Sequence, residues 1–218
     1  MKFAIDGQTP APRAAYMKST SEPADSNFRR YVGVAAFLAV VTGVSFFWQQ
    51  YTTVYHFAVV QPGALYRSGA LSRREWNTVI TRIQPKTDVC LVDEREMNDP
   101  GKPKFKDEVS FLKERGVAVV RIPVRLGGWP SNADVQRFLS VAADPANQPV
   151  LVHCDQGVRR TAMMVAAYQE SILGMDRNQA KEQILSFGHS RSTIDDIRRF
   201  IDLYNAKTRT APPELAVR

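Results

Sequence analysis

The residues best suited to carry out chemistry are Cys154 and Arg160, which follow a short apolar run and are separated by five residues. The segment reads Val150-Leu151-Val152-His153-Cys154-Asp155-Gln156-Gly157-Val158-Arg159-Arg160-Thr161. A strand that ends at the cysteine and a helix that begins near Thr161 leave a loop short enough to curl around one anion. The backbone N–H groups of such a loop and the positive end of the helix both favour a bound anion. The pattern therefore predicts a phosphate-sized anion site with a thiol at its base.

The same environment favours the thiolate form of Cys154. A free cysteine has a pKa of about 8.5, and a helix N-terminus or a nearby cation lowers it. A thiolate beneath a bound phosphate is a nucleophile for phosphoryl transfer. The planar guanidinium of Arg160 can bind two phosphate oxygens at once, which a lysine ammonium cannot do. Gly157 supplies the backbone freedom that a tight loop needs.

The His153-Cys154-x5-Arg160-Thr161 pattern resembles the active-site signature of cysteine-dependent protein tyrosine and dual-specificity phosphatases, of the small bacterial or atypical type. Two other blocks resemble the opening of these domains and the segment after their active-site helix. They are residues 60–69 (Val-Gln-Pro-Gly-Ala-Leu-Tyr-Arg-Ser-Gly) and residues 184–189 (Ile-Leu-Ser-Phe-Gly-His). The resemblance covers roughly residues 56–205.

The resemblance implies a two-step phosphoester hydrolysis in which Cys154 forms a phosphocysteine that water then hydrolyses, without a metal or another cofactor. It implies a substrate-binding loop made of Asp155, Gln156, Gly157, Val158, Arg159 and Arg160. It also implies two supporting residues. Thr161 donates its hydroxyl to the cysteine sulfur, and His153, with its ring facing away from the substrate, orders the loop.

The general acid that protonates the leaving group is the least defined part of the predicted site. Trp129-Pro130 resembles the Trp-Pro-Asp loop of protein tyrosine phosphatases, but Ser131 stands where Asp is expected. Asp134 is the nearest carboxylate and our candidate for the acid, although Ser131-x-x-Asp134 also reads as the start of a helix, where an acidic residue is favourable. The alternatives are Asp93 or Glu94 at the end of the preceding strand, or no side-chain acid at all.

Two residues near the predicted site have two interpretations each. Arg159 either extends the positive field toward multiply charged substrates or is a solvated surface residue. Cys90 is either a small apolar residue of a central strand or, as in some relatives of the resembled family, a redox partner that protects Cys154 as a reversible disulfide.

Composition limits the remaining function classes. The chain has 218 residues, 44% of them hydrophobic, which suffices for one globular domain with additional segments. The net charge of +7 is spread along the chain without a basic run interleaved with aromatics, so it favours anionic substrates or a membrane surface over nucleic acid. The two cysteines provide neither a zinc-binding pattern nor a disulfide framework.

The N-terminal part of the chain differs from the rest. Residues 1–30 are rich in Ala, Pro, Ser and Thr, and we expect a disordered tail. Residues 32–48 carry no charge, and residues 31–51 predict a transmembrane anchor with aromatic residues at one end. A cleaved signal peptide and a buried core helix are the alternatives. The basic residues Arg13, Lys18, Arg29 and Arg30 precede the span, so we expect the catalytic domain on the non-cytoplasmic side.

The remaining residues alternate short strands and helices. We expect strands at 56–60, 65–67, 88–93, 117–122 and 150–153, and helices at 72–83, 105–115, 132–142, 160–172, 177–187 and 194–205. Ser72-x-x-Glu75 predicts a helix start, Gly116 a helix end, and Thr193 to Asp196 the cap of the last helix. The prediction is an α/β domain at 56–205 with a central, mainly parallel sheet flanked by helices, resembling the phosphotyrosine-phosphatase fold, followed by a C-terminal tail at 206–218.

The expected function is that of a membrane-anchored protein tyrosine or dual-specificity phosphatase acting on a phosphorylated protein or a small phosphoester. One alternative keeps the chemistry and makes the substrate an inositol phosphate or a phosphoinositide. Another is a pseudophosphatase that binds phosphate groups without turnover, which the missing Asp would favour and the intact Cys154 and Arg160 oppose.

Overall fold

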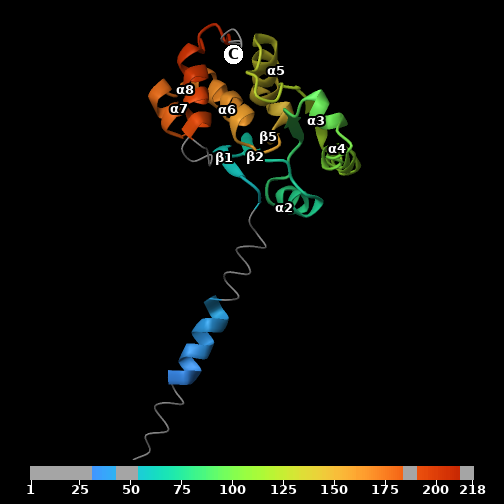
Figure 1. Ribbon diagram of the computed structural model, residues 1–218, viewed down its shortest axis with the longest axis vertical. Coiled ribbons are helices and arrows are strands. Elements are labelled where there is room, and N and C mark those ends of the chain that lie inside the picture. Colours follow the sequence, from blue (N-terminus) through green and yellow to red (C-terminus); the bar gives the residue numbers. More distant parts are fainter. Residues whose placement is uncertain (1–30, 43–53, 184–190, 212–218) are drawn as a thin grey trace, which may run out of the picture. The chain divides into compact units, whose positions relative to one another are not determined.

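The protein is described by a computed structural model that covers residues 31–42, 54–183 and 191–211. The chain divides into two units, residues 1–50 and residues 51–218. The first unit contains a helix over residues 31–42 whose apolar side chains, Phe37 and Val40 among them, are exposed. The second unit is an α/β domain around a five-stranded sheet (Figure 1).

Within the described ranges, no helix combines the length and the apolar character that crossing a bilayer requires. The transmembrane helix expected over residues 31–51 is therefore not found. Residues 43–51 of that span and the expected tail at 1–30 lie outside the described residues.

The sheet has the strand order β1-β2-β5-β3-β4, which places β5 at its centre. Among the strand pairs of this sheet in the described residues, β1–β2 is antiparallel and the other three are parallel. The strands are β1 (Ala58–Gln61), β2 (Leu65–Ser68), β3 (Thr87–Cys90), β4 (Ala118–Arg121) and β5 (Val150–His153). The predicted fold class of a mainly parallel sheet flanked by helices is confirmed, and it delivers the segment after His153 to the carboxyl edge of the central strand.

Helices cover both faces of the sheet. They are α2 (Arg73–Ile83), α3 (Glu94–Asn98), α4 (Lys104–Glu114), α5 (Asn132–Ala143), α6 (Arg159–Ser171), α7 (Arg177–Gln183) and α8 (Arg191–Leu203), with a short 3-10 helix at Pro145–Asn147. Figure 1 shows α6, α7 and α8 gathered together, in orange to red.

The residues of β5 alternate between the two faces, as the pleat of a strand requires. Val150 and Val152 belong to the core cluster formed with α5, α6 and α8, which also contains Cys154. Leu151 belongs to the opposite cluster, with Trp76 of α2 and Leu112 of α4. His153 has Trp76 as an aromatic neighbour, so its ring lies on this opposite face.

Local sequence signals explain where most helices begin and end. Ser72 caps α2 and Ser131 caps α5, each through a reciprocal capping box with the residue three positions on, Glu75 and Asp134 respectively. Gly116 follows α4 with a φ of 73°, in the left-handed region that ends helices. The expected strands and helices are thus found with small shifts of most bounds, while residues 184–187 of the helix expected at 177–187 lie outside the described residues.

Four expectations differ from the structure or lie outside it. The expected strand 88–93 is shorter, because Asp93 caps a further helix, α3, that we did not predict. α8 already includes Arg191, so Thr193 lies within the helix and does not precede it. The block at residues 184–189 lies outside the described residues. The expected tail does not begin at 206, because Asn205 pairs with Thr210 across a turn and Ala211 is buried in the core.

Candidate active site

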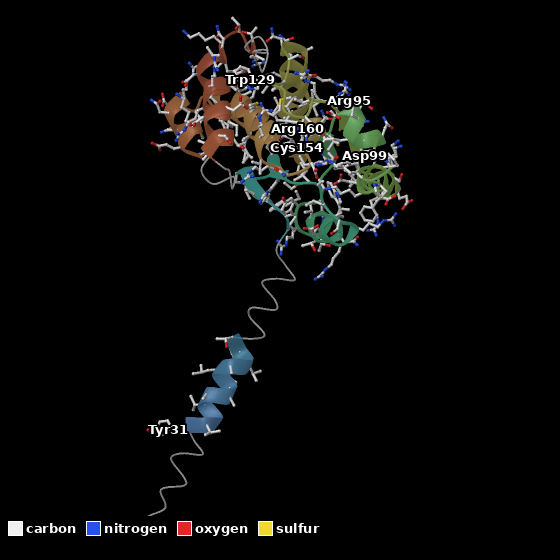
Figure 2. The ribbon with its side chains drawn as sticks, viewed as in Figure 1. Tyr31, Arg95, Asp99, Trp129, Cys154 and Arg160 are labelled. Carbon is white, nitrogen blue, oxygen red and sulfur yellow. The ribbon has the colours of Figure 1, made fainter. Side chains whose placement is uncertain are left out.

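Cys154 lies at the bottom of a pocket at the carboxyl edge of the sheet, between β5 and α6. The pocket has a volume of about 410 Å³. Its lining residues come from the cysteine loop, from α3 and the segment after it, from the β4–α5 connection and from α8: Glu96, Lys102, Leu126, Gly127, Cys154, Asp155, Gln156, Val158, Arg159, Arg160 and Thr193. Figure 2 shows Cys154 and Arg160 close together within the domain. The predicted nucleophile and arginine therefore meet in one cavity.

The backbone of the loop is held by the segment around β2. The carbonyl oxygens of Asp155, Gln156 and Gly157 bond the backbone N–H of Ala70 (2.9 Å), the His56 ring (Nδ1, 2.6 Å) and the Arg67 guanidinium (3.3 Å). These three bonds fix the loop backbone, and the backbone N–H groups of Gly157 and Thr161 bond the Cys154 sulfur. This is the arrangement that an anion-binding loop needs.

Gly157 is required by the same close approach. Its φ is 69°, and a Cβ built there would lie 2.2 Å from the carbonyl oxygen of Ser68 and 2.5 Å from the nitrogen of Gly69. A side chain would therefore push the loop away from β2. Glycine is thus required at position 157 for two reasons: the backbone freedom that the sequence predicted, and the lack of space for a Cβ.

The Cys154 thiol is 3% exposed, and its surroundings favour the thiolate. Burial by itself raises its pKa, but the Arg160 guanidinium, the Thr161 hydroxyl and the backbone N–H groups of Thr161 and Gly157 outweigh burial, so the pKa lies below its ordinary value. The Thr161 hydroxyl is buried and lacks an oxygen or nitrogen partner among the described residues. This agrees with the supporting role expected for Thr161 beside the sulfur.

Arg160 is 4% exposed and is fixed by a carboxylate that sequence reasoning missed. Its Nη1 and Nη2 bond the two carboxylate oxygens of Glu96 at 2.6 and 3.2 Å, and Nη1 also donates to the carbonyls of Leu91 and Val124. Burial lowers the pKa of Arg160, but Glu96 and the Cys154 thiolate outweigh that effect and raise it. A signal was present: Asp93-x-x-Glu96 directly after a buried strand is a capping-box pattern that places Glu96 in a first helical turn.

His153 lies behind the loop, as expected, in a buried polar cluster. Its Nε2 is 3.3 Å from Asp88 and 3.7 Å from Glu108, while Nδ1 is 3.3 Å from the carbonyl oxygen of Cys154. Glu108 also accepts hydrogen bonds from the Trp76 indole and the Leu71 backbone. Burial lowers the pKa of His153, but the two carboxylates outweigh it and raise the pKa well above its ordinary value. His153 thus connects the nucleophile's backbone to the core.

The other two charged side chains of the loop, Asp155 and Arg159, form ion pairs. The Asp155 carboxylate lies 2.5 Å from the Lys104 ammonium and 3.7 Å from that of Lys102. Arg159 bonds Asp196 of α8 and the carbonyl of Gly128. Neither interpretation of Arg159 anticipated this partner, because nothing in the local sequence connects positions 159 and 196.

Two of the candidate acids, Asp134 and Asp93, take part in helix caps, and the third, Glu94, forms an ion pair. The Asp134 carboxylate accepts hydrogen bonds from the Ser131 backbone and hydroxyl at 2.8 and 2.7 Å, and Asp134 is not among the described residues that line the pocket. Asp93 accepts from the backbone of Glu96 and Leu126, and Glu94 pairs with Arg121. The assignment of Asp134 as the acid stays a prediction.

Cys90 packs with Val92, Met97 and Phe105 on the α4 side of the sheet, whereas Cys154 belongs to the cluster on the α6 side. Both thiols are free in this structure. Cys90 fills the core in the way a small apolar residue would, and its role as a redox partner stays a prediction.

The fold and the loop together define a phosphatase of the cysteine-dependent class. Residues 64–207 match the family described as "DSP-PTPase phosphatase fused to NAD+ Kinase". Because this match covers more than half of the chain, the protein belongs to that dual-specificity-type phosphatase family.

Curated relatives are similar over part of their length. A probable chloroplastic NAD kinase 2 from Oryza sativa subsp. japonica is 30% identical over 111 residues, which cover 51% of this chain and 11% of the relative. The inositol diphosphatase SIW14 of Saccharomyces cerevisiae is 21% identical over 66% of this chain and 49% of its own. The dual specificity protein phosphatase TpbA of Pseudomonas aeruginosa is 27% identical over 62% and 55%. The matched part of the chain therefore spans between 11% and 55% of the length of these relatives.

Solved structures share the fold. The core catalytic domain of the PP-IP phosphatase SIW14 from S. cerevisiae superimposes with a TM-score of 0.59 at 20% identity, over 71% of this chain and 88% of that one. P. aeruginosa TpbA gives a TM-score of 0.55 at 23% identity, also over 71% and 88%. These likenesses confirm the phosphotyrosine-phosphatase-like fold.

Proposed function

We propose that this protein hydrolyses phosphate monoesters of phosphorylated proteins through a phosphocysteine on Cys154. The observation that supports this best is the buried thiol of lowered pKa in a pocket beside the doubly anchored guanidinium of Arg160. The similarity to dual specificity phosphatases such as TpbA supports the same class of substrate.

In the first step the Cys154 thiolate attacks phosphorus, the S–P bond forms and the bond to the leaving oxygen breaks. The loop N–H groups and Arg160 bind the three equatorial oxygens, whose charge is spread in the transition state. Thr161 then stabilises the sulfur as a leaving group while water attacks the phosphocysteine. Inorganic phosphate leaves, the thiolate is restored, and the proton lost by water balances the one gained by the leaving alcohol.

The direct test uses a tyrosine-phosphorylated peptide and para-nitrophenyl phosphate with the full chain. Wild-type protein releases phosphate from both, whereas Cys154→Ser and Arg160→Lys lose nearly all activity. A matched control is Arg159→Lys, which changes the neighbouring arginine in the same way and retains measurable turnover. Undiminished phosphate release by Cys154→Ser would contradict the proposal.

A second candidate substrate is an inositol phosphate or phosphoinositide. The rim of the pocket favours it, because Lys102 and Lys104 bring two ammonium groups close to the cysteine loop, and the similarity to the inositol diphosphatase SIW14 supports it. Comparing kcat/KM for a phosphotyrosine peptide, a phosphoinositide and a soluble inositol phosphate separates the two. A preference for the peptide of tenfold or more, an order-of-magnitude criterion, favours the first candidate.

Because the Asp134 carboxylate caps α5, we expect the rate of turnover to depend on the leaving group. For the same reason, a phosphate-binding pseudophosphatase stays an alternative. An enzyme without a positioned acid turns over good leaving groups and fails with poor ones. Asp134→Asn decides the acid's identity: an unchanged rate with a poor leaving group clears Asp134 of the role. A burst of product from the wild-type protein excludes the pseudophosphatase.

We also propose that the N-terminal unit attaches the protein to a membrane, with the phosphatase domain on the non-cytoplasmic side. The uncharged run of residues 32–48 and the exposed apolar side chains of helix 31–42 support it. An alkaline phosphatase reporter fused after Arg218 tests the orientation. An inactive alkaline phosphatase fusion, beside an active fusion of a reporter that works in the cytosol, would count against this orientation.

A further inference from the structure

The second arginine of the cysteine loop, Arg159, has all three of its nitrogens engaged by protein atoms. Nε and Nη2 each lie 2.5 Å from Oδ2 of Asp196, and Nη1 donates to the carbonyl of Gly128 at 2.6 Å. The two charged side chains are only 22% and 33% exposed. Because a guanidinium presents its donors in a fixed fork, one arginine can join a helix and a loop at once.

Asp196 makes a second connection to the same loop. Its other oxygen, Oδ1, accepts a hydrogen bond from the Trp129 indole at 3.0 Å. Trp129 is 9% exposed and packs edge-to-face on Phe200 of α8, with ring centroids 5.8 Å apart. The Asp196 carboxylate thus ties both Arg159 of the cysteine loop and Trp129 of the β4–α5 connection to α8.

The β4–α5 connection forms part of the pocket wall. Leu126 and Gly127 line the cavity, and Gly127 has a φ of 77°. The connection is also fixed at its start, where Val124 accepts from Arg160 and the Leu126 N–H donates to Asp93. Without the contacts to Arg159 and Asp196, Gly128 would keep the hydrogen bond from its N–H to the Arg125 carbonyl (2.9 Å), which lies within the same connection, and Trp129 would keep its packing on Phe200.

We propose that Arg159 and Asp196 are positioning residues that hold residues 126–129 in place as a wall of the pocket. This inference rests on the proposed phosphatase function for its kinetic consequence. In this arrangement Arg159 acts on the substrate through the loop and does not bind the phosphate itself. Losing either partner loosens the wall, so substrate binding weakens and the Trp129 indole becomes accessible to solvent.

Two single variants and their double variant test the pair in the full chain carrying Trp48→Phe. Arg159→Lys keeps the charge and loses the fork, and Asp196→Asn keeps an acceptor for Trp129 and loses the charge. Asp195→Asn is the matched control, since Asp195 is the exposed neighbour on the same helix. Acrylamide quenching of tryptophan fluorescence reports on Trp129, because the other described tryptophan, Trp76, is fully buried.

Losing a charge-assisted hydrogen bond typically changes an equilibrium by about tenfold. We therefore expect Arg159→Lys and Asp196→Asn each to raise KM for para-nitrophenyl phosphate by about that factor and to increase quenching of Trp129. The double variant resembles either single variant, because both remove one connection. Asp195→Asn behaves like the wild-type protein in both measurements.

The alternative is that Arg159 binds the substrate phosphate, and that Asp196 only competes with the phosphate for the Arg159 guanidinium. In that case Asp196→Asn leaves KM unchanged or lowers it, and Trp129 stays protected. That result would overturn the proposal. The quenching measurement needs no turnover, so it tests the positioning pair even if the proposed activity fails. Circular dichroism of each variant, with Arg159→Lys as the milder change, separates a loosened wall from a misfolded domain.

Discussion

The two carboxylate oxygens of Glu96 bond the two terminal nitrogens of Arg160, at 2.6 and 3.2 Å, and both side chains are buried. This pairing fixes the guanidinium plane over the pocket before any phosphate arrives. A planar fork that is already oriented loses less freedom when it binds phosphate oxygens. Glu96 therefore contributes to the site without being a nucleophile or an acid.

Glu96→Gln tests this positioning. The amide retains the size and one acceptor of the carboxylate but loses the charged pair, so we expect kcat/KM to fall by about 10- to 100-fold. Steady-state kinetics with para-nitrophenyl phosphate measures the fall. Glu114→Gln is the control, because Glu114 is an exposed residue at the end of α4. Equal rates for both variants would show that the Arg160 pairing does not matter.

The lowered pKa of Cys154 predicts the pH dependence of its alkylation. Iodoacetamide reacts with the thiolate, so half-maximal reactivity should fall below the value of about 8.5 for free cysteine. Thr161→Val removes one hydrogen bond to the sulfur and should raise the midpoint by about one pH unit. Thr78→Val, on the outer face of α2, should leave it unchanged. A wild-type midpoint above that of free cysteine would contradict the assigned environment.

The buried cluster behind the loop predicts how stability depends on pH. Burial raises the pKa of Glu108, and the two carboxylates raise that of His153, so the folded state holds both protons more tightly than the unfolded state. A group with a raised pKa stabilises the fold below its unfolded pKa, and this contribution is lost as the pH rises. We therefore expect the free energy of unfolding to decline as the pH rises above the ordinary His value of 6.5.

Cys154 has the opposite sign, because its lowered pKa adds stability that is present above its unfolded pKa and is lost as the pH falls. Urea unfolding between about pH 6 and pH 9 should therefore be measured in the Cys154→Ser background. The decline with pH should be smaller in Cys154→Ser/Glu108→Gln, since His153 loses its strongest charged partner. A flat profile in Cys154→Ser alone would contradict the cluster's assigned protonation.

Gly157→Ala tests whether space as well as backbone freedom limits the loop. A Cβ at this position meets the backbone of Ser68 and Gly69, so the loop must shift. A shift of about 1 Å in a catalytic group can cost on the order of 100-fold in rate, and we expect at least that loss. Gly63→Ala is the control, with a similar φ of 75° but no atom within 4 Å of its Cβ. Gly63→Ala should cost about 1–2 kcal/mol of stability and leave activity intact.

Local patterns in the sequence predicted the parts of the fold that local physics decides. The apolar run at 150–153, the Ser72 and Ser131 capping boxes and Gly116 each describe one element through its own residues, and each is found. The placement of Cys154 and Arg160 in one pocket followed from the same reasoning, because the loop that joins them is short.

The partners of these residues could not be predicted in the same way. Glu96 lies 64 positions from Arg160, and Asp196 lies 37 positions from Arg159. Pairings at such separations are decided by how α3 and α8 pack around the sheet. The interpretation of Asp134 shows the converse: its local role as a capping residue was readable from Ser131-x-x-Asp134, and that is the role the structure displays.

The most direct test of the central claim is to trap the intermediate. Wild-type protein is mixed with excess para-nitrophenyl phosphate, quenched with acid within one turnover, digested and examined by mass spectrometry. We predict one added phosphoryl group on the peptide that contains Cys154, and none on that peptide from Cys154→Ser. Steady phosphate release without any phosphorylated Cys154 peptide, or with undiminished turnover in the serine variant, would contradict the account.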